Sequence, residues 1–533
     1  MSVIARIEFV GWIVFVLAAM PALAQSGVVE GSVVDAVTKV PIAGAVVKLY
    51  RGDKAVHSGA SDTQGLFRID GVSHGQYRAV IDNSEHMRLA SDHPAPRTFV
   101  VSAANPEVRL RAELVPLGQV AGRVLSPSGE PMKGVPVGMR RLWDEHWTQT
   151  AISGDGGLFR FRRLEPGTWI LAGLPSFRIS SGDRAKDPKP LAPPAAEEGR
   201  RVGWAATFFP GVVDLAGAEK IVLRPGTVLE GYDVKLRTVP LRRLSGVVVD
   251  EDGKPAPKAA LSLTDLANKG ANGALKAADG DGCFEFDSVK DGEWRIFAQV
   301  GQSGRRLKGY VDLHVWGRDV NGIEVRLTAP FAVKGFVDRE EPRDKDGNRK
   351  VTAVYLIPQG ALPDLQESTF HEQDGSFALK NVYAGRYRVL PAGYVPGYYV
   401  ASIWYGDQEV TTQAVDILSP PLLLKIVYRW GGARATGTVE RGEGTWVVLV
   451  PQDEALRDPF QFIRTARCEA YGRFSIDSLR PGSYYAFAFD RVTGKMLEDV
   501  EFVRKLVPHA VRVEVRHGET ANLELRPQLW PDY

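Results

Sequence analysis

The sequence is poor in cysteine, in charge of one sign and in helical periodicity, and each shortage excludes a class of protein. Two cysteines, Cys283 and Cys468, occur in 533 residues, so the chain is no disulfide scaffold, and we expect two buried or free thiols. The formal net charge is +2 and no run of five or more lysines and arginines occurs, which argues against a nucleic-acid partner.

Motifs of catalytic and metal sites are also missing. None of the nine histidines is followed by a glutamate three residues later, so the sequence does not encode a His-x-x-Glu zinc site. It has no His-Glu-x-x-His, no phosphate-binding loop and no Gly-x-Gly-x-x-Gly segment. We therefore expect no catalytic residues, no metal ion and no cofactor.

Residues 1–24 are predicted to be a cleaved secretory signal. Arg6 is a weak positive start, residues 9–23 are mostly apolar, and Ala22-Leu23-Ala24 supplies the small residues after which signal peptidases cleave. The apolar stretch is shorter than the roughly 20 residues that span a bilayer, and no second stretch of membrane length follows. An uncleaved N-terminal anchor is the alternative. We expect an exported protein, periplasmic, on the cell surface or extracellular, with no integral membrane segment in the mature chain.

What the sequence does contain is a motif that recurs five times. Counted from a glycine, the motif has an aromatic residue at +2, Ile, Leu or Phe at +4, Val or Leu at +7, glycine at +10 and Tyr or Trp at +12. The five copies are Gly65, Phe67, Ile69, Val72, Gly75, Tyr77; Gly157, Phe159, Phe161, Leu164, Gly167, Trp169; Gly282, Phe284, Phe286, Val289, Gly292, Trp294; Gly375, Phe377, Leu379, Val382, Gly385, Tyr387; and Gly472, Phe474, Ile476, Leu479, Gly482, Tyr484.

Two further markers frame each copy and define a unit of about ninety residues. A Gly-x-Val segment precedes each copy by 34 to 40 residues, and alternating apolar residues close each unit. The opening segments are Gly31–Val33, Gly122–Val124, Gly246–Val248, Gly335–Val337 and Gly437–Val439. A period this long is typical of self-contained domains rather than of solenoid repeats.

The motif predicts a turn, a short strand, a second turn and the start of another strand. Phe67 and Ile69 alternate with the polar Arg68 and Asp70, which is the period of two of a strand with one buried face. The aromatic residue at +12 can pack over the second turn while its polar tip reaches the backbone, as in the tyrosine corner of immunoglobulin-like sandwiches. With helical patterns sparse, we predict an all-β chain of five tandem immunoglobulin- or transthyretin-like β-sandwich domains.

The predicted boundaries follow from the markers. The sandwiches are expected at residues 25–116, 117–240, 241–329, 330–430 and 431–533. The second contains a polar, proline-rich insertion near residues 176–203, which is typical of an exposed loop.

The first unit resembles a known family. Gly31-Ser-Val-Val-Asp35, Pro41-Ile-Ala-Gly44, Phe67-Arg-Ile69 and Gly75-Gln-Tyr77 are similar to the carboxypeptidase regulatory-like domain, and the second and third units share the pattern. The fourth and fifth units lack the Pro-x-x-Gly step and match less well. The resemblance implies a transthyretin-like, seven-stranded sandwich of the carbohydrate-binding-like fold. It also implies an accessory, non-catalytic domain of exported bacterial proteins.

The sequence contains two kinds of candidate site, and each also has a purely structural interpretation. Asp279-Gly-Asp281-Gly282 could suggest calcium, but it lies at the motif turn and lacks the other ligands of a calcium loop, so we interpret it as a turn. Exposed aromatic faces could stack on sugars, and core packing is the alternative for each cluster. The candidate ligand surface consists of Trp204, Phe208, Phe209, Tyr398, Tyr399, Trp404 and Tyr405; Trp143, Trp147 and Tyr394 are further aromatic residues of the same kind.

These observations predict an exported, non-enzymatic binding or scaffold protein with carbohydrate as the favoured ligand. The carbohydrate assignment depends on the fold resemblance and on the aromatic residues. A structural or protein-interaction protein of the cell envelope is the first alternative. An accessory subunit of an exported peptidase or transporter is the second. The partner is accordingly either a polysaccharide or an envelope protein.

Overall fold

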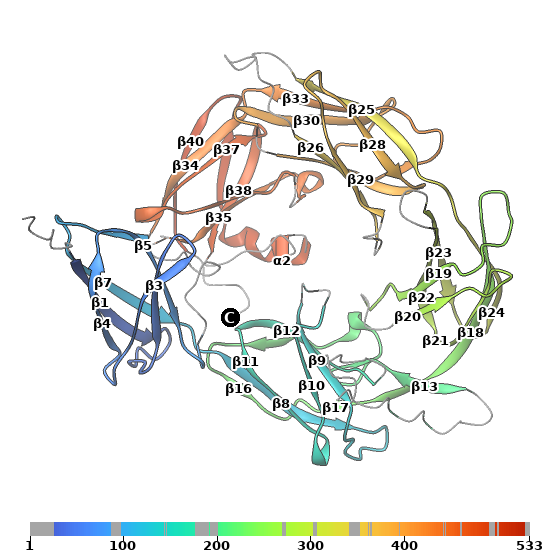
Figure 1. The fold of residues 1–533 in the computed structure, drawn as a ribbon, viewed down its shortest axis with the longest axis horizontal. Helices are drawn as coiled ribbons and strands as arrows, with labels where there is room; N and C mark the ends of the chain where they lie inside the picture. The colour runs from blue at the N-terminus through green and yellow to red at the C-terminus, as the bar shows by residue number, and fades with distance from the viewer. Residues whose placement is uncertain are drawn as a thin grey trace, which may run out of the picture. The chain divides into compact units, whose positions relative to one another are not determined.

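The structure is a computed structural model of the chain. It describes residues 26–86, 98–142, 144, 146–175, 191, 194, 201–268, 273–301, 306–339, 352–360, 362, 365–393, 395–440, 442, 444–458, 461–489, 496–497 and 500–527. The predicted signal peptide, most of the proline-rich insertion, Trp143 and Tyr394 lie outside these residues. The chain forms two compact units, one within residues 1–34, 39–81 and 97–113 and the other within residues 35–38, 82–96 and 114–533. Nearly all of the regular structure is β-strand, as Figure 1 shows and as the repeats predicted.

Each repeat builds two sheets, which we call together a sandwich and number from first to fifth. In one sheet the opening strand lies between the motif strand and the closing strand. The other sheet has four or five strands and includes the strand that starts at the motif's second glycine. The closing strand runs parallel to the opening strand in the second to fifth sandwiches.

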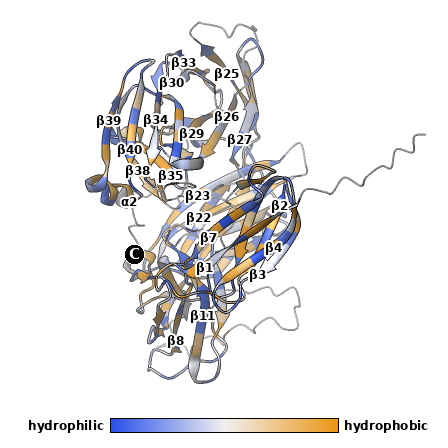
Figure 2. Cartoon of the chain, turned by 90° about the vertical axis from the view of Figure 1, so that its left-hand side faces the viewer, coloured by the Kyte–Doolittle hydropathy of each residue, from blue (hydrophilic) through white to orange (hydrophobic). Residues whose placement is uncertain are grey.

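The first sandwich has seven strands in sheets of three and four, in the orders β4-β1-β7 and β3-β2-β5-β6. Burial alternates strictly along β7, and Figure 2 shows hydrophobic and hydrophilic residues mixed along the strands. Its strands are β1 (Ser26–Asp35), β2 (Val46–Arg51), β3 (Lys54–Ala60), β4 (Leu66–Ser73), β5 (Gly75–Asp82), β6 (Thr98–Val101) and β7 (Glu107–Leu114).

The second sandwich carries an added layer. Residues 206–218, which follow the insertion, pack on the outer face of a sheet and form a small second core around Ile170 and Phe208. Its strands are β8 (Gly118–Leu125), β9 (Pro136–Arg141), β10 (Gln149–Ile152), β11 (Leu158–Leu164), β12 (Gly167–Gly173), β14 (Thr207–Phe208), β15 (Ile221–Leu223), β16 (Val228–Leu229) and β17 (Val234–Lys235), with the short 3-10 helices η1 (Asp155–Gly157) and η2 (Leu215–Gly217).

The third sandwich begins without a separate linker. Its opening strand β18 runs through the predicted boundary at residue 240, with Leu244 in the third core, and Leu236 just before the strand lies in the second core. The start of β18 pairs with β13, which overlaps the end of the predicted insertion. The strands are β13 (Val202–Ala205), β18 (Arg237–Val249), β19 (Ala260–Asp265), β20 (Gly273–Ala277), β21 (Cys283–Lys290), β22 (Gly292–Val300), β23 (Leu307–Val315) and β24 (Val320–Arg326).

The fourth sandwich has two strands more than the common plan, β30 (Tyr398–Tyr405) and β31 (Gln408–Glu409), and β31 lies at the edge of the sheet. The aromatic segment Tyr398–Tyr405 forms β30 and pairs antiparallel with the closing strand β33. The strands are β25 (Phe331–Arg339), β26 (Ala353–Pro358), β27 (Glu367–Phe370), β28 (Ser376–Val382), β29 (Gly385–Ala392), β30, β31 (Gln408–Glu409), β32 (Val415–Ile417) and β33 (Leu424–Trp430).

The fifth sandwich carries a helix that the sequence did not predict. Helix α2 (Val500–Leu506) packs Phe502, Val503 and Leu506 against Phe487 and Phe489 on the outer face of a sheet. The remaining elements are β34 (Ala433–Val439), β35 (Trp446–Pro451), β36 (Arg464–Arg467), β37 (Arg473–Leu479), β38 (Gly482–Phe489), β39 (Val511–Val515) and β40 (Thr520–Leu525), with the 3-10 helices η4 (Glu454–Leu456), η5 (Ala470–Gly472) and η6 (Val507–His509).

The glycine of each Gly-x-Val segment lies opposite the motif aromatic at +2, because only glycine leaves room there. In the fifth sandwich Gly437 pairs with Phe474, and a Cβ at Gly437 would lie 1.8 Å from the Leu523 carbonyl oxygen. The closing strand can therefore approach closely, and the phenyl ring covers the gap. The same pairing occurs at Gly31↔Phe67, Gly122↔Phe159, Gly246↔Phe284 and Gly335↔Phe377.

The aromatic residue at +12 forms the predicted corner in all five sandwiches. Each is at most 3% exposed and donates its O–H or indole N–H to the backbone carbonyl at +8, over 2.6–3.0 Å. The bonds run from Tyr77 to Ser73, Trp169 to Glu165, Trp294 to Lys290, Tyr387 to Tyr383 and Tyr484 to Arg480. The motif residues therefore serve folding, as the sequence predicted.

Candidate binding site between the fourth and fifth sandwiches

Two of the aromatic residues predicted to face a ligand are core residues, which corrects the prediction for them. Phe208 is fully buried in the small second core of the second sandwich. Tyr405 is 6% exposed, and its hydroxyl accepts a hydrogen bond from the Leu422 N–H at 3.0 Å. Both rings are covered because β14 and the end of β30 turn them toward apolar neighbours.

Trp204 and Phe209 are half-buried and pack against the main core of the second sandwich. The Phe209 and Tyr232 ring centroids are 5.1 Å apart. Trp147 likewise packs on the small second core, 6.4 Å from the Phe208 ring. This group of aromatic residues therefore serves packing, which was the alternative interpretation of the sequence.

The remaining candidates lie on β30 of the fourth sandwich, and all are half-buried. The Trp404 indole donates to Ser402 Oγ at 2.9 Å. The Tyr398 ring packs edge-on against Trp430 with centroids 5.1 Å apart. Tyr398 and Tyr399 line a cavity of about 280 Å³ between the fourth and fifth sandwiches. The structure thus brings two of the seven predicted residues to one cavity.

Hydrogen bonds between the two sandwiches build the walls of this cavity. Arg480, at motif position +8 of the fifth repeat, donates through Nη1 to the carbonyls of Val400 at 3.2 Å and Ala401 at 2.7 Å. Ser478 Oγ donates to the Val395 carbonyl at 3.0 Å and accepts from the Gly397 N–H at 3.1 Å. The motif turn of the fifth sandwich therefore holds β30 and the segment before it.

A buried ion pair supports the opposite wall. Arg388 of the fourth sandwich lies 2.8 Å from the carboxylate of Asp458 in the fifth, and the Asp458 side chain is 4% exposed. Asp458 also accepts the Gln461 backbone N–H at 2.9 Å. The pair fixes the loop that carries Gln461 to the cavity wall.

The cavity itself is polar, and its charged residues have one sign. Arg464 and Arg480 line it, and no aspartate or glutamate is among the described lining residues. Gln461 also lines it, is 9% exposed, and has a side-chain amide whose nitrogen and oxygen both lack a hydrogen-bond partner. Burial raises the pKa of Tyr484, another lining residue, to about 12, while the charges of Arg480 and Arg464 act to lower it.

Sequence reasoning missed Gln461, Arg464 and Arg480. The repeats nevertheless held a signal for the two arginines. Eight residues before the motif glycine the five units have His57, Gln149, Ala274, Glu367 and Arg464, and eight residues after it they have Ser73, Glu165, Lys290, Tyr383 and Arg480. Arginine at both positions occurs in the fifth unit alone, whereas nothing in the local sequence marks Gln461.

Ion pairs of one lysine stabilise the junction between the second and third sandwiches. The Lys290 ammonium lies 3.3 Å from Asp265 Oδ2 and 3.7 Å from Asp214 Oδ1, and Asp265 is fully buried. Asn268 completes the group by donating its amide to Asp265 at 2.8 Å and by accepting the Leu215 N–H at 2.8 Å.

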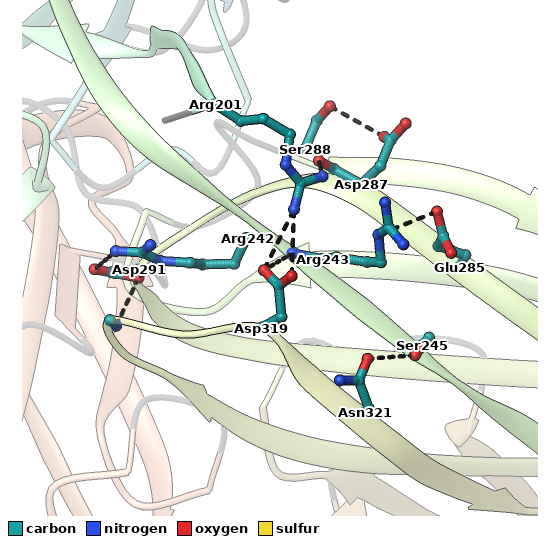
Figure 3. Close-up of polar contacts among 11 residues, drawn as sticks. Arg201, Arg242, Arg243, Ser245, Glu285, Asp287, Ser288, Asp291, Asp319 and Asn321 are labelled. Atoms are coloured by element: carbon teal, nitrogen blue, oxygen red, sulfur yellow. Dashed lines mark hydrogen bonds and ion pairs between the residues drawn. The ribbon is translucent and has the colours of Figure 1, made fainter. Parts of the chain in front are cut away.

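Ion pairs on the adjacent sheet add to this junction (Figure 3). Arg201 donates to the Asp319 carboxylate at 3.3 and 3.4 Å, and Asp319 also accepts the Arg243 backbone N–H at 2.8 Å. Arg242 makes a two-point contact with Asp291, which lowers the pKa of that carboxyl. Each arginine shown here has a carboxylate or carbonyl of the chain as its partner, so the cluster serves as a joint.

The junction between the third and fourth sandwiches is closed by an aromatic residue at the same repeat position. The Tyr383 hydroxyl donates to the Arg306 carbonyl at 2.8 Å, and the Lys308 ammonium lies 5.1 Å from the centre of the Tyr383 ring. Phe297 of the third sandwich is part of the core cluster of the fourth. Position +8 therefore contacts the preceding sandwich in the third, fourth and fifth repeats.

Larger grooves of about 600 and 490 Å³ lie on the first and second sandwiches, over the Gly-x-Val strands at Gly31 and Gly122. They occupy equivalent places in two repeats and are bordered by surface ion pairs such as Arg68–Glu30 and Arg123–Asp233. We therefore assign these grooves to the common shape of the sandwich.

The remaining sequence candidates have structural roles. Asp279 Oδ1 accepts the N–H groups of Asp281 and Cys283 at 3.0 and 2.8 Å, which is a turn, and no group of three metal-ligating side chains was found among the described residues. Sequence reasoning missed that Gly71–Gly75 spells Gly-x-Ser-x-Gly. Ser73 ends a strand and is followed by strand β5 rather than by the helix of a hydrolase nucleophile turn.

The thiols and the membrane prediction can also be checked within the described residues. Both cysteines are free, with Cys283 exposed and Cys468 buried, as expected. Burial raises the pKa of the Cys468 thiol. No helix in the described part of the chain is long and apolar enough to cross a membrane.

Comparisons with known proteins identify no family for the chain. No family model matches the chain, and no curated protein matches it. The resemblance to the carboxypeptidase regulatory-like domain therefore stays a prediction.

Several solved structures are similar at low identity. The Bacillus anthracis TIE protein is 12% identical over 73% of this chain and 68% of its own, with a TM-score of 0.16. A streptococcal ancillary pilin is 12% identical over 56% and 98%, with a TM-score of 0.20. Two B repeat units of the Staphylococcus aureus collagen binding protein are 10% identical over 76% and 99%, with a TM-score of 0.14. Since these scores are far below those of a shared overall fold, the sandwich assignment rests on the strand order and packing described above.

Proposed function

We propose that the chain is a non-catalytic, exported binding and scaffold protein that holds a carbohydrate between its fourth and fifth sandwiches. The observation that carries the proposal is the cavity of about 280 Å³, whose lining residues Tyr398, Tyr399 and Gln461 are not shared by the repeats. Among the described lining residues, only Tyr484 belongs to the shared motif, and its hydroxyl is already bonded to the Arg480 carbonyl. Recognition is thus assigned to what differs between repeats.

The composition of the cavity suits a sugar. A sugar ring offers an apolar face and several hydroxyl groups, and the lining offers the rings of Tyr398, Tyr399 and Tyr428 together with the Gln461 amide. Pockets for small ligands commonly occupy about 300–1,000 Å³, and this cavity of about 280 Å³ lies just below that range, so the ligand would be small. The resemblance to the carbohydrate-binding-like fold is the second support, and export follows from the predicted signal peptide.

A panel of polysaccharides tests this proposal. The purified chain should bind at least one insoluble or arrayed polysaccharide, and Tyr399→Ala should weaken that binding. Trp316→Ala is the matched control, because Trp316 is an aromatic residue 71% exposed on the third sandwich. Failure across a broad panel would contradict the carbohydrate proposal. Metal-dependent release of C-terminal residues from peptides by the pure protein would contradict the non-catalytic part.

A protein-interaction role is the second candidate, and one observation favours it. Strand β20 (Gly273–Ala277) is an edge strand, all five of its residues are exposed, and Leu275 is 86% exposed. Such an edge can pair with a strand of another protein. The partner is then an envelope protein, such as an exported peptidase or transporter for which this chain is an accessory subunit. Mild crosslinking in the native host should capture that partner, whereas recovery of a lone monomer would count against it.

A further inference from the structure

The outermost strand of the third sandwich is more open than its counterparts in the other four. Strand β20 is the first strand in the sheet order β20-β19-β22-β23, and all five of its residues are exposed. The equivalent edge strands β3, β10, β27 and β36 each include at least two half-buried residues. No strand of the described residues pairs with the outer side of β20, so this edge is open to a strand of another chain.

The backbone groups on the open side of β20 follow from the hydrogen bonds to its neighbour. The Ala278 N–H donates to the Ala259 carbonyl at 2.9 Å, and these two residues continue the antiparallel register of β19 and β20. Because bonded and non-bonded pairs alternate in such a ladder, every second residue counted back from Ala278 bonds to β19. The N–H and C=O groups of the residues between them point to the open side, and these residues are Gly273, Leu275 and Ala277.

The side chains of β20 do not block an incoming strand. Proteins often protect a sheet edge with a projecting lysine. Lys276 is the charged residue of this strand, and its ammonium instead donates to the Glu285 carbonyl at 2.5 Å, on the facing sheet of its own sandwich. Leu275 at the centre is 86% exposed, and the other residues of the strand are glycine and alanine. The strand is therefore an unprotected edge with one large apolar side chain at its middle.

The sequence of β20 complements itself about Leu275. When two copies pair antiparallel around a two-fold axis at this residue, Leu275 lies opposite its own counterpart, Gly273 opposite Ala277, and Ala274 opposite Lys276. The residues whose backbone groups point to the open side then face one another, as the hydrogen bonds of a ladder require. No charged residue faces another, so the pairing avoids opposed like charges.

We propose that β20 is a homodimerisation edge, at which two copies of the chain join their four-stranded sheets into one continuous sheet. The backbone groups of Gly273, Leu275 and Ala277 form the hydrogen bonds, and the two exposed leucine side chains come into contact. The proposal rests on the edge named for the protein-interaction role and makes a second copy of the chain its occupant. It does not depend on carbohydrate binding.

Sedimentation velocity and hydrogen exchange test the proposal together. The purified chain should shift from monomer to dimer as its concentration rises toward about 1 mM, the weak range expected of a small contact. Over the same concentrations, amide exchange should slow in residues 273–277 and stay unchanged in the equivalent edge strand β27. A chain that stays monomeric up to about 1 mM overturns the proposal, and so does a dimer in which residues 273–277 exchange as fast as in the monomer.

Three variants locate the contact. Leu275→Pro should abolish the dimer and leave the chain folded, because the N–H that it removes points to the open side and makes no bond to β19. Ser368→Pro is the matched control and should dimerise like the unmodified chain. Ser368 is exposed on β27, also seven residues before the motif glycine, and the bond from the His371 N–H to the Thr352 carbonyl gives its own N–H the same outward direction. Leu275→Lys keeps the backbone groups and should weaken the dimer about fivefold, because it places two lysines opposite each other.

The outcomes separate the homodimer from the protein-interaction role. A Leu275→Pro variant that is folded by thermal unfolding and still dimerises overturns the homodimer at β20. If Leu275→Pro does not fold, Leu275→Lys decides, and an unchanged dimer then overturns the proposal. A monomeric chain that crosslinks to another protein through β20 in the native host overturns the homodimer and leaves the protein-interaction role standing. A dimer that Leu275→Pro dissociates and Ser368→Pro does not supports the homodimer, whatever the polysaccharide panel shows.

Discussion

The junction before the third sandwich and the junction before the fifth use the same repeat position in opposite ways. Position +8, whose carbonyl receives the corner hydrogen bond, is Lys290 in the third repeat and Arg480 in the fifth. Lys290 lies 3.3 Å from the fully buried Asp265, so its charge is matched by the chain. Arg480 bonds backbone carbonyls beside a cavity. We call the junction before the third sandwich the closed joint, because a carboxylate of the chain faces position +8 there. We call the junction before the fifth sandwich the open joint, because backbone carbonyls face position +8 beside a cavity.

The largest expected effect comes from breaking the closed joint. Lys290→Met should lower the free energy of unfolding of the chain by about 3–5 kcal/mol, because it leaves the buried Asp265 carboxylate without its cation. The change is measured as a lower midpoint of thermal unfolding in scanning calorimetry at pH 7.

A double variant separates charge from packing at this joint. Lys290→Met combined with Asp265→Leu should recover most of the lost stability, because removal of both charges leaves no buried ion. If the double variant is as unstable as Lys290→Met alone, the Lys290–Asp265 pair does not stabilise the junction through its charge. The contrast between the closed joint and the open joint would then be wrong for the closed joint.

The second prediction concerns the aromatic residue at motif position +12. It can ionise in the fifth sandwich, where it is a tyrosine, and cannot ionise in the third, where it is a tryptophan. Burial raises the pKa of Tyr484 to about 12 from an ordinary value near 10, whereas the third sandwich has Trp294 in this place. A pKa raised in the folded state stabilises the fold fully below pH 10, and that contribution is lost as the pH rises through about 12. The loss attributable to Tyr484 should amount to about 2 kcal/mol between these pH values.

Tyr484→Phe provides the measurement. The variant should be about 1 kcal/mol less stable at pH 7, because the bond to the Arg480 carbonyl is lost, yet its stability should fall less steeply between pH 10 and 12. Trp294→Phe is the matched control, since it removes the corresponding bond of the third sandwich without removing a titrating group. Equal alkaline slopes for Tyr484→Phe and the unmodified chain would contradict the prediction.

The repeated part of the fold was predictable from the sequence because the contacts that require its residues lie within a single repeat. Gly437 is required by the close approach of the Leu523 carbonyl, and Tyr484 by a core place beside its own turn, so both recur at fixed spacing. The joints were not predictable in this way. The pairing of Lys290 with Asp214 depends on how two sandwiches meet, and no spacing within a repeat encodes that contact.

The candidate site was predicted only in part, for a related reason. Tyr398 and Tyr399 were predicted from the sequence to lie on a candidate ligand surface, and both line the cavity. Alternation could not show that Tyr405 turns into the core, since its place depends on a bond from Leu422. Gln461 lies in a loop whose position is set by the Arg388–Asp458 pair, so only the folded chain brings it to the site.

A smaller effect than at the closed joint is expected from breaking the open joint. Arg480→Met should lower the free energy of unfolding by about 1–2 kcal/mol, because two hydrogen bonds to the carbonyls of Val400 and Ala401 are lost but no buried carboxylate is left unpaired. The exposed Arg473→Met is the control and should change stability by no more than about 0.5 kcal/mol. A loss at Arg480 as large as that at Lys290 would mean that the fifth junction also depends on a matched charge. A loss between the control and Lys290→Met would instead agree with an arginine that the chain positions through the backbone carbonyls of Val400 and Ala401.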